Sequence, residues 1–309
     1  MNRTRAQMRG HGPECLFFGA GAWGRNVIEA FVACGGDPRG FLVRANPETR
    51  NWLAARFPGA MVSSDPSELL DSVAAPIVVV ATPRDTHADL AELALRAHRD
   101  VFVEKPMATE PADCARLTSV ADAEGVALFT GFTYLYHGAY ACLRDAVAAN
   151  EIEQLTFTWN RPGLRGPTEW ELLPHDLAIA IGLTGRTPAR IRLEVTGGRV
   201  QCRWALDDNR IVQIEQDGGG SGPKDKRVRV VTKRGDVWEW RGNHLAMWDS
   251  ATETSKPDLA IDYSPKEPLV REVKWFLAHR ADRSATRADA ALSTSVTELI
   301  NRALTEKQE

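Results

Sequence analysis

The stretch CLFFGAGAWGRN, residues 15–26, decides the fold that this chain is expected to adopt. It places three glycines as a GxGxxG motif directly after a short apolar run and directly before a helical pattern. In that context the glycines let the backbone approach a pyrophosphate at the N-terminus of a helix. The stretch therefore predicts a dinucleotide site, with a plain tight turn as the alternative. The residues expected to line this site are Gly19, Gly21, Ala22, Trp23 and Gly24.

The position that would bind the ribose of the cofactor carries a cation instead of an acid. An acidic residue about twenty positions after the motif, at the end of the second strand, would bind the 2′-hydroxyl of NAD. Here that strand ends in FLVRANPETR, residues 41–50, and Arg44 stands at this place. A guanidinium suits a phosphate, so the sequence favours NADP over NAD. A solvated surface arginine is the alternative.

The sequence on both sides of the motif repeats one pattern up to about residue 131. Helical stretches alternate with continuous apolar runs, which lie at 15–18, 41–43, 77–80, 101–103 and 126–129. This alternation is typical of a parallel sheet covered on both faces. We expect a doubly wound α/β domain of the Rossmann type over residues 14–132. We assign Thr82 and Pro83, which follow one of these strands, to the cofactor site; the alternative is that Thr82 only satisfies the loop backbone.

The second half of the chain has a different texture. From residue 152 to about 240, segments such as IEQLTFTWN (152–160) and RIVQIEQ (210–216) alternate apolar and polar residues. Such alternation predicts half-buried strands, here in a mostly antiparallel sheet. One helix is expected before these strands and two after them. We expect an α+β domain over residues 133–309 that binds substrate, and a disordered leader at 1–13.

The segment VFVEKPMAT, residues 101–109, leaves a buried strand in an unusual way. Three apolar residues run directly into Glu104 and Lys105, and Pro106 prevents a simple continuation. Charged side chains are costly at such a place unless something nearby needs them. The segment therefore marks a candidate functional position.

Three segments together resemble the glucose–fructose oxidoreductase, inositol dehydrogenase and rhizopine-catabolism family (Gfo/Idh/MocA). They are GAGAWGRN (19–26), ATPRDTHADLAELALRAHRDVFVEKPMAT (81–109) and EWELLPHDLAIAIGLTG (169–185). The resemblance covers the N-terminal half almost continuously and thins in the second half. The tryptophan of the first segment and the PHDL of the third are similar to members that act on sugars joined to nucleotides.

This resemblance implies roles for several residues. In the family the lysine of the Glu-Lys-Pro element faces nicotinamide and substrate, so Lys105 is expected to bind both and to transfer a proton. The resemblance also places Glu104 and His87 at the cofactor, with Pro106 fixing the turn. An ammonium near the reacting oxygen stabilises the charge that develops as the hydroxyl proton leaves. A lysine that merely extends from a strand end to solvent is the alternative.

The resemblance further implies a catalytic pair in the second half. Glu171 and His175 lie four residues apart, close enough to face each other over one helical turn. The family usually has aspartate at the acid position, and this chain has the longer glutamate. We expect general acid–base work from the pair, with a structural histidine as the alternative. Tyr134 and Arg161 are expected at the substrate, with packing as the alternative for the tyrosine.

Composition excludes several other functions. A net charge of −3 argues against a dedicated nucleic-acid or membrane-surface partner. The five cysteines lie far apart, without a CxxC pair or a Cys/His cluster, which suggests neither a disulfide framework nor a metal site. Reduced thiols fit a soluble, cytoplasmic protein. Family members often pair through an open-faced second sheet, so the resemblance also implies a homo-oligomer, a dimer or tetramer.

The sequence thus predicts an oxidoreductase that uses NADP or NAD. It would transfer a hydride between the nicotinamide and a secondary alcohol or ketone of a sugar, cyclitol or sugar-nucleotide-like substrate, with Lys105 and His175 flanking the reacting carbon. One alternative is an enzyme with tightly held cofactor and no net redox change. Another is a sugar-sensing or NADP-sensing regulator that has lost turnover.

Overall fold

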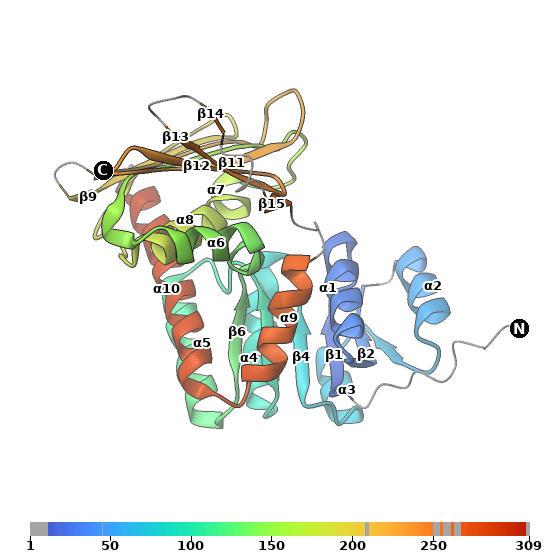
Figure 1. The fold of residues 1–309 in the computed structure, drawn as a ribbon. Coiled ribbons are helices and arrows are strands. Elements are labelled where there is room, and N and C mark those ends of the chain that lie inside the picture. The colour runs from blue at the N-terminus through green and yellow to red at the C-terminus, as the bar shows by residue number, and fades with distance from the viewer. Residues whose placement is uncertain are drawn as a thin grey trace, which may run out of the picture. The chain divides into compact units, whose positions relative to one another are not determined.

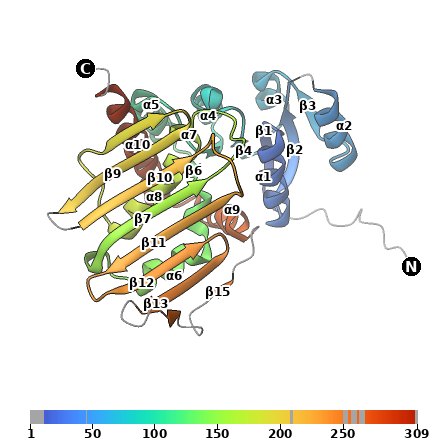
Figure 2. The same ribbon diagram turned by 90° about the horizontal axis from the view of Figure 1, so that it is seen from above.

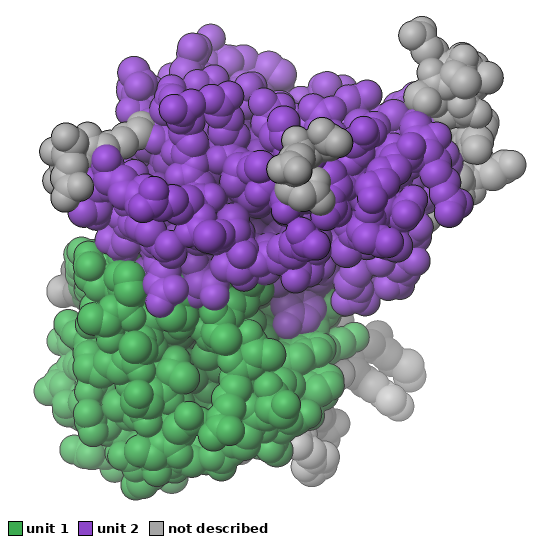
Figure 3. All heavy atoms as spheres, turned by 90° about the vertical axis from the view of Figure 1, so that its left-hand side faces the viewer, with its two compact units in different colours: residues 1–131, 269–294 green, residues 132–268, 295–309 purple. Residues whose placement is uncertain are grey.

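The structure is a computed structural model that describes residues 12–44, 46–207, 210–249, 254–255, 261–262 and 267–306. The chain divides into two compact units, coloured separately in Figure 3. Unit 1 comprises residues 1–131 and 269–294, and unit 2 comprises residues 132–268 and 295–309. The expected leader lies almost entirely outside the described residues. Across the described residues, no helix combines the length and apolar character needed to cross a membrane.

Unit 1 contains a parallel sheet of six strands in the order β3-β2-β1-β4-β5-β6 (Figure 1). The strands are β1 (Glu14–Phe18), β2 (Asp37–Leu42), β3 (Met61–Ser63), β4 (Ile77–Val80), β5 (Asp100–Glu104) and β6 (Leu128–Gly131). The helices are α1 (Ala22–Ala33), α2 (Pro47–Arg56), α3 (Pro66–Ser72), α4 (His87–Arg96), α5 (Pro111–Glu124) and α9 (Glu267–His279), with the 3-10 turn η2 (Arg84–Thr86) before α4. The strand order reverses direction at β1, as in a doubly wound sheet, so the predicted fold class is confirmed.

The apolar content of the strands explains this arrangement. Every residue of β4 is fully buried, because helices cover both faces of the sheet. Helix α1 buries Val27, Ile28 and Phe31 on one stripe, and its Phe31 ring packs against Phe17 of β1. The strand β3 was not predicted, because its three residues are too few to show a pattern.

Helix α9 belongs to unit 1 although it lies far along the chain. Its Phe276 ring packs 5.5 Å from Phe102 and 5.5 Å from Phe129, centroid to centroid, and 6.2 Å from Phe31. This aromatic contact groups residues 269–294 with the first sheet. The predicted second domain, residues 133–309, included this helix, because local pattern does not reveal which sheet a late helix covers.

Unit 2 is built on a second sheet of nine strands, ordered β14-β13-β12-β11-β7-β10-β9-β8, with β15 paired to β13. The strands are β7 (Ile152–Asn160), β8 (Arg192–Thr196), β9 (Arg199–Asp207), β10 (Arg210–Asp217), β11 (Asp225–Thr232), β12 (Asp236–Arg241), β13 (His244–Asp249), β14 (Thr254–Ser255) and β15 (Ile261–Asp262). Among the described pairings of this second sheet, only that of β7 with β10 is parallel. The predicted mostly antiparallel sheet is confirmed.

Helices cover one face of this second sheet, and Figure 2 shows its other face uncovered by any labelled helix. The covering elements are η3 (Thr133–Tyr136), α6 (Gly138–Ala146), η4 (Ala149–Glu151), α7 (Thr168–Glu171) and α8 (Leu173–Thr184), and α10 (Arg283–Thr305) reaches this unit from residue 295 onward. Along β7, buried residues alternate with partly exposed ones, which matches the period of a strand with one covered face.

Candidate functional site

The glycine motif forms a tight turn between β1 and α1, in which Gly19 and Gly24 leave no room for a side chain. Gly19 has a φ of +102°, and a Cβ there would lie 2.5 Å from the Ala81 carbonyl oxygen. A Cβ at Gly24 would lie 2.7 Å from the Gly19 carbonyl oxygen. At Gly21 a Cβ would meet nothing within 4 Å, so this side of the turn is open. The turn therefore packs closely against the strands and leaves one side accessible to a ligand.

The start of α1 suits an anion. Gly21 is the N-cap residue, and the helix start has no side-chain cap hydrogen bond and no acidic residue in its first turn. The first amides of the helix and the positive end of its dipole are thus available to a diphosphate. Ala22 is exposed, and Trp23 exposes 47% of its surface. The chemistry of this turn is compatible with a bound dinucleotide, and the assignment of the five residues to the cofactor stays a prediction.

Arg44 lies next to this turn. It follows β2 by two residues, and the Gly19 amide donates to the Leu42 carbonyl at 2.9 Å, which joins the two strand ends. The Arg44 side chain is exposed. After it, the Asn46 side chain accepts from the Thr49 amide at 3.1 Å and caps α2. An exposed guanidinium at the carboxyl end of the second strand suits a 2′-phosphate, so the preference for NADP stays a prediction.

His87 occupies a buried position between two functional turns. Its Nδ1 lies 2.8 Å from the Pro106 carbonyl oxygen, and its Nε2 lies 2.9 Å from the Thr82 carbonyl oxygen. The residue is only 2% exposed. The imidazole therefore connects the turn after β4 with the turn after β5. It thereby holds the turn of Thr82 and Pro83, which were predicted to bind the cofactor, and the Thr82 hydroxyl accepts from the Thr86 hydroxyl at 2.8 Å.

Glu104 and Lys105 stand at the carboxyl end of β5, as expected. The Glu104 side chain is buried and hydrogen-bonds the side chain of Trp23. Burial raises the pKa of Glu104 to about 7, while Trp23 and the charge of Lys105 act in the opposite direction. The peptide bond between Lys105 and Pro106 is cis. In a sheet of this type, ligands bind beyond the carboxyl ends of the strands, which is where Lys105 lies.

The pair Glu171 and His175 does not lie on one continuous helix. Glu171 is the last residue of α7, and His175 lies in the first turn of α8. The break falls at Leu172, whose φ of −111° departs from helical values. Pro174 explains the break, because it lacks the amide that would continue the ladder from α7. The junction between α7 and α8 therefore lies between Glu171 and His175. Their catalytic pairing stays a prediction.

An aromatic group surrounds His175. The Tyr134 ring lies 5.0 Å from the imidazole, nearly perpendicular to it, and Trp159 lies 6.0 Å away. Tyr134 also meets Trp159 at 5.4 Å and Trp240 at 6.0 Å. Burial raises the pKa of Tyr134, so its phenol stays protonated at neutral pH. The structure thus brings Tyr134 and His175 together, as their shared assignment to the substrate requires.

A buried ion pair lies beneath this aromatic group and was not predicted. Lys226 Nζ lies 2.5 Å from one Asp176 oxygen, and Gln216 donates to the other at 2.7 Å. The same Nζ lies 3.6 Å from the Trp159 ring centroid and 4.1 Å from that of Tyr134. Burial lowers the pKa of Lys226, and the Asp176 carboxylate opposes this. The only signal in the sequence was a lysine at an inward position of the strand KRVRVV (226–231).

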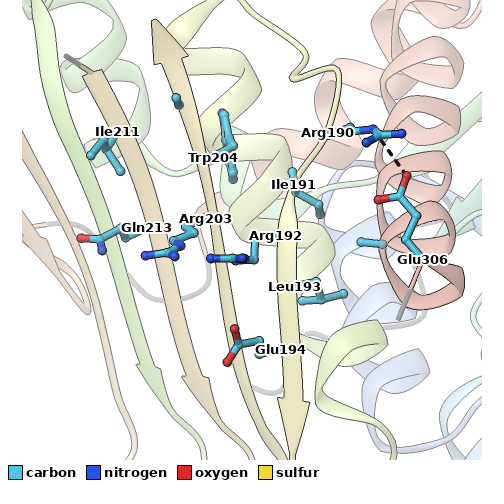
Figure 4. A pocket seen from close by; sticks show the side chains of 12 residues that line it. Arg190, Ile191, Arg192, Leu193, Glu194, Arg203, Trp204, Ile211, Gln213 and Glu306 are labelled. Atoms are coloured by element: carbon cyan, nitrogen blue, oxygen red, sulfur yellow. Dashed lines mark ion pairs between the residues drawn. The ribbon is translucent and has the colours of Figure 1, made fainter. Parts of the chain in front are cut away.

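A hollow of about 760 Å³ lies elsewhere on unit 2, over β8, β9, β10 and the end of α10 (Figure 4). Ile211, Gln213 and Arg203 line it from the strands, and Arg190 pairs with Glu306 across it at 3.5 Å. None of the residues predicted for catalysis, cofactor or substrate lines this hollow. It is therefore distinct from the site built around His175.

Residues 14–132 match a family model described as an oxidoreductase family with an NAD-binding Rossmann fold, the GFO_IDH_MocA family. Over this region, which is less than half of the chain, the sequence is similar to the Gfo/Idh/MocA family. The matched residues include the glycine turn, Arg44, His87 and the Glu-Lys-Pro segment. The resemblance stated from the sequence is confirmed, and with it an NAD-binding type of fold in unit 1.

Two curated relatives differ in how much of the chain they match. A dTDP-3,4-didehydro-2,6-dideoxy-alpha-D-glucose 3-reductase of Streptomyces violaceoruber is 32% identical over 129 residues, 41% of this chain and 37% of the relative. This alignment thus spans about a third of that relative's length. The scyllo-inositol 2-dehydrogenase (NAD(+)) of Bacillus subtilis (strain 168) is 28% identical over 299 residues, 86% of this chain and 85% of the relative.

A solved structure matches both units. The UDP-N-acetylglucosamine 3-dehydrogenase GnnA from Acidithiobacillus ferrooxidans has a TM-score of 0.80 and 20% identity, covering 94% of this chain and 96% of its own. At this identity the match establishes the fold alone. The likeness in fold thus includes the second sheet as well as the first.

Proposed function

We propose that this protein is an NAD(P)-dependent oxidoreductase that acts on a secondary alcohol or ketone of a sugar-like substrate. The observation that carries the proposal is in unit 1. An open glycine turn follows β1, and Lys105 follows β5 at the same carboxyl edge of one parallel sheet. A dinucleotide bound at that edge would lie along the strand ends, where Lys105 supplies an ammonium. The relatives named as reductase and dehydrogenases support the same reaction class.

In this proposal, residues of both units take part in the reaction. The nicotinamide, when bound, supplies the hydride chemistry. Lys105 stabilises negative charge on the substrate oxygen as its proton is transferred. His175, held between Tyr134 and Trp159, has the ring nitrogens that a general acid or base requires. Glu171 would orient the imidazole across the junction between α7 and α8 and stabilise its protonated form.

Arg44 supports NADP as the cofactor. Its guanidinium is exposed beside the turn, and no ion pair joins it to a carboxylate among the residues that the structure describes. A charge of that kind is available to a 2′-phosphate. An NADP preference would fit reduction of a ketone in biosynthesis, so this direction is part of the proposal.

A steady-state assay tests the reaction directly. The purified chain is mixed with NADPH or NADH and with a panel of keto-sugars, cyclitols and sugar nucleotides, while the absorbance of the reduced nicotinamide is followed. Net, substrate-dependent oxidation supports the proposal. Conversion of a sugar without net change in absorbance would identify the tightly-held-cofactor enzyme instead. Sugar or NADPH binding without any conversion would identify the regulator.

We also propose that two or more copies of the chain associate through the uncovered face of the second sheet. Ile211 on β10 exposes 46% of its surface there, and no labelled helix covers this face in Figure 2. Ile211→Glu should shift the mass measured by light scattering to that of the monomer. An unchanged mass would remove this face from the interface. A cytoplasmic location is a further proposal, supported by five cysteines that form no disulfide.

A further inference from the structure

Two cations lie next to each other at one end of the β7–β11 strand pair of the second sheet. Trp159 on β7 and Lys226 on β11 are paired residues, and both are buried. Arg161 follows Trp159 by two positions, and Lys224 precedes Lys226 by two positions. Since the two strands are antiparallel, both cations lie at the same end of the strand pair. Both lie just beyond the strands, because β7 ends at Asn160 and β11 begins at Asp225, and these two end residues are paired. Arg161 is half-buried and Lys224 is exposed.

The backbone around these two cations is fixed by hydrogen bonds. The Arg161 amide donates to the Asp217 carbonyl at 2.8 Å. The Asn160 side chain donates to the carbonyls of Ser221 and Pro223 at 3.2 and 2.9 Å, which anchors the segment that leads to Lys224. The two charges are therefore held beside each other by the fold.

The nearby carboxylates are engaged with other partners. Asp176 accepts from Lys226 and Gln216. Asp217 pairs with Arg199 at 2.9 Å, and Asp225 pairs with Arg241 at 2.9 Å. Within the part of the chain that the structure describes, no ion pair joins Arg161 or Lys224 to a carboxylate.

The two cations act on each other and on the aromatic group at His175. Partial desolvation lowers the pKa of Lys224, and the charge of Arg161 lowers it further. Burial raises the pKa of Tyr134, against which the charge of Arg161 acts. Tyr134 in turn lies 5.0 Å from the His175 ring. Two like charges held together in this way are stabilised when an anion lies between them.

We propose that Arg161 and Lys224 bind an anionic group of the substrate, a phosphoryl group or a carboxylate, close to the His175 site. The inference rests on the proposed oxidoreductase function and narrows its substrate class. The substrate is then a sugar phosphate, a nucleotide-linked sugar or a sugar acid, and a neutral sugar or cyclitol is excluded. Arginine offers the planar fork that both anions accept, and lysine adds a point charge.

Calorimetric titration of the full chain, saturated with NADPH, tests the anion site. Saturation prevents the probes from binding at the glycine turn. The probes are UDP, glucose 6-phosphate and glucuronate, with myo-inositol as the neutral comparison. We expect at least one anion to bind, and Arg161→Gln or Lys224→Gln to weaken it about ten- to a hundredfold, the usual loss for one charged hydrogen bond. The probe that binds tightest identifies the source of the anion.

Matched variants separate this role from a structural one. Arg229→Gln removes an exposed arginine from the opposite face of β11 and should leave anion binding unchanged. Lys224→Arg keeps the charge and should retain binding. Failure of all three anions to bind, or binding unaffected by both glutamine variants, would overturn the anion site.

The anion site and the proposed reaction fail in different ways. Turnover of a neutral sugar that neither glutamine variant slows would refute the anion site and would still support the proposed oxidoreductase reaction. Anion binding that depends on Arg161, without any oxidation of NADPH, would refute the proposed oxidoreductase reaction and would still support the anion site.

Discussion

His87 connects two turns of unit 1, and its replacement by glutamine tests how much the cofactor edge depends on that connection. The imidazole nitrogens lie 2.8 and 2.9 Å from the carbonyl oxygens of Pro106 and Thr82. Both partners are acceptors. A neutral imidazole has one N–H and donates to only one of them, whereas an imidazolium donates to both. The protonation state of this one ring therefore decides how firmly the two turns are joined.

The expected loss of stability follows from these contacts. The glutamine amide can occupy the place of only one ring nitrogen, and it does not fill the space of the ring between the two turns. A neutral imidazole donates to one of the two carbonyls, and loss of that buried hydrogen bond costs about 1–3 kcal/mol of unfolding free energy. Because Pro106 follows Lys105 directly, His87→Gln should also lower turnover and weaken NADPH binding.

The pH dependence of this loss has a definite sign. Burial lowers the pKa of His87, and the charge of Lys105 acts in the same direction, although the hydrogen bonds to Pro106 and Thr82 and the charge of Asp85 oppose it. The unfolded chain, with a histidine pKa of about 6.5, then binds the proton more tightly than the folded chain. The wild type should lose stability relative to His87→Gln as the pH falls below about 6.5, by at most about 1.4 kcal/mol per pH unit.

Urea unfolding followed by circular dichroism between pH 5 and 8 measures this difference. His98→Asn serves as the control, because His98 is exposed and has a positive φ of 55° that asparagine tolerates. Its ion pair with Glu124 lies at the surface, so this substitution should change the stability little. If the advantage of the wild type over His87→Gln instead grows as the pH falls, His87 is an imidazolium bonded to both carbonyls, and the reasoning from burial is refuted.

Three further predictions concern the proposed reaction. Arg44→Asp should reverse a preference for NADPH that is worth about ten- to a hundredfold, measured by fluorescence titration, and equal affinities in the wild type would contradict it. Lys105→Ala should keep cofactor affinity and reduce kcat by about 10²–10⁴-fold, and a loss of only a few-fold would make the lysine structural. His175→Asn should lower kcat and flatten one limb of the pH–rate profile, and Glu171→Gln should lower kcat less. The double variant should lower kcat by less than the product of the two single effects, and an unaltered profile would leave the pair as a packing feature.

The fold was predictable because its signals are local. The glycine turn, the apolar strands of unit 1 and the alternation along β7 and β10 each occupy fewer than a dozen consecutive residues. The assignment of α9 to unit 1 was not predictable, since it depends on Phe276 meeting Phe102 and Phe129 from far along the chain. Sequence pattern identifies an amphipathic helix but does not say which sheet it covers.

The candidate site was predictable to a similar extent. Lys105 and Glu104 stand at a strand end, as the segment VFVEKPMAT indicated. The helix break at Leu172 could have been expected from Pro174, but the spacing of Glu171 and His175 suggested a single turn. The contact of His87 with two carbonyls and the pairing of Asp176 with Lys226 join distant segments, so no local pattern reveals them.

Each unit buries an ionisable side chain at the place where its proposed functional residue lies. Glu104 in unit 1 directly precedes Lys105, and its pKa is raised to about 7 by burial. In unit 2, the buried Lys226 contacts the rings of Tyr134 and Trp159, and the His175 imidazole lies near the same two rings. Apolar residues at such positions are often neutral or stabilising relative to buried charges, so stability alone does not account for them. Glu104 and Lys226 are thus two buried ionisable residues, each close to a residue with a proposed catalytic role. Catalytic roles for Lys105 and His175 predict such an arrangement.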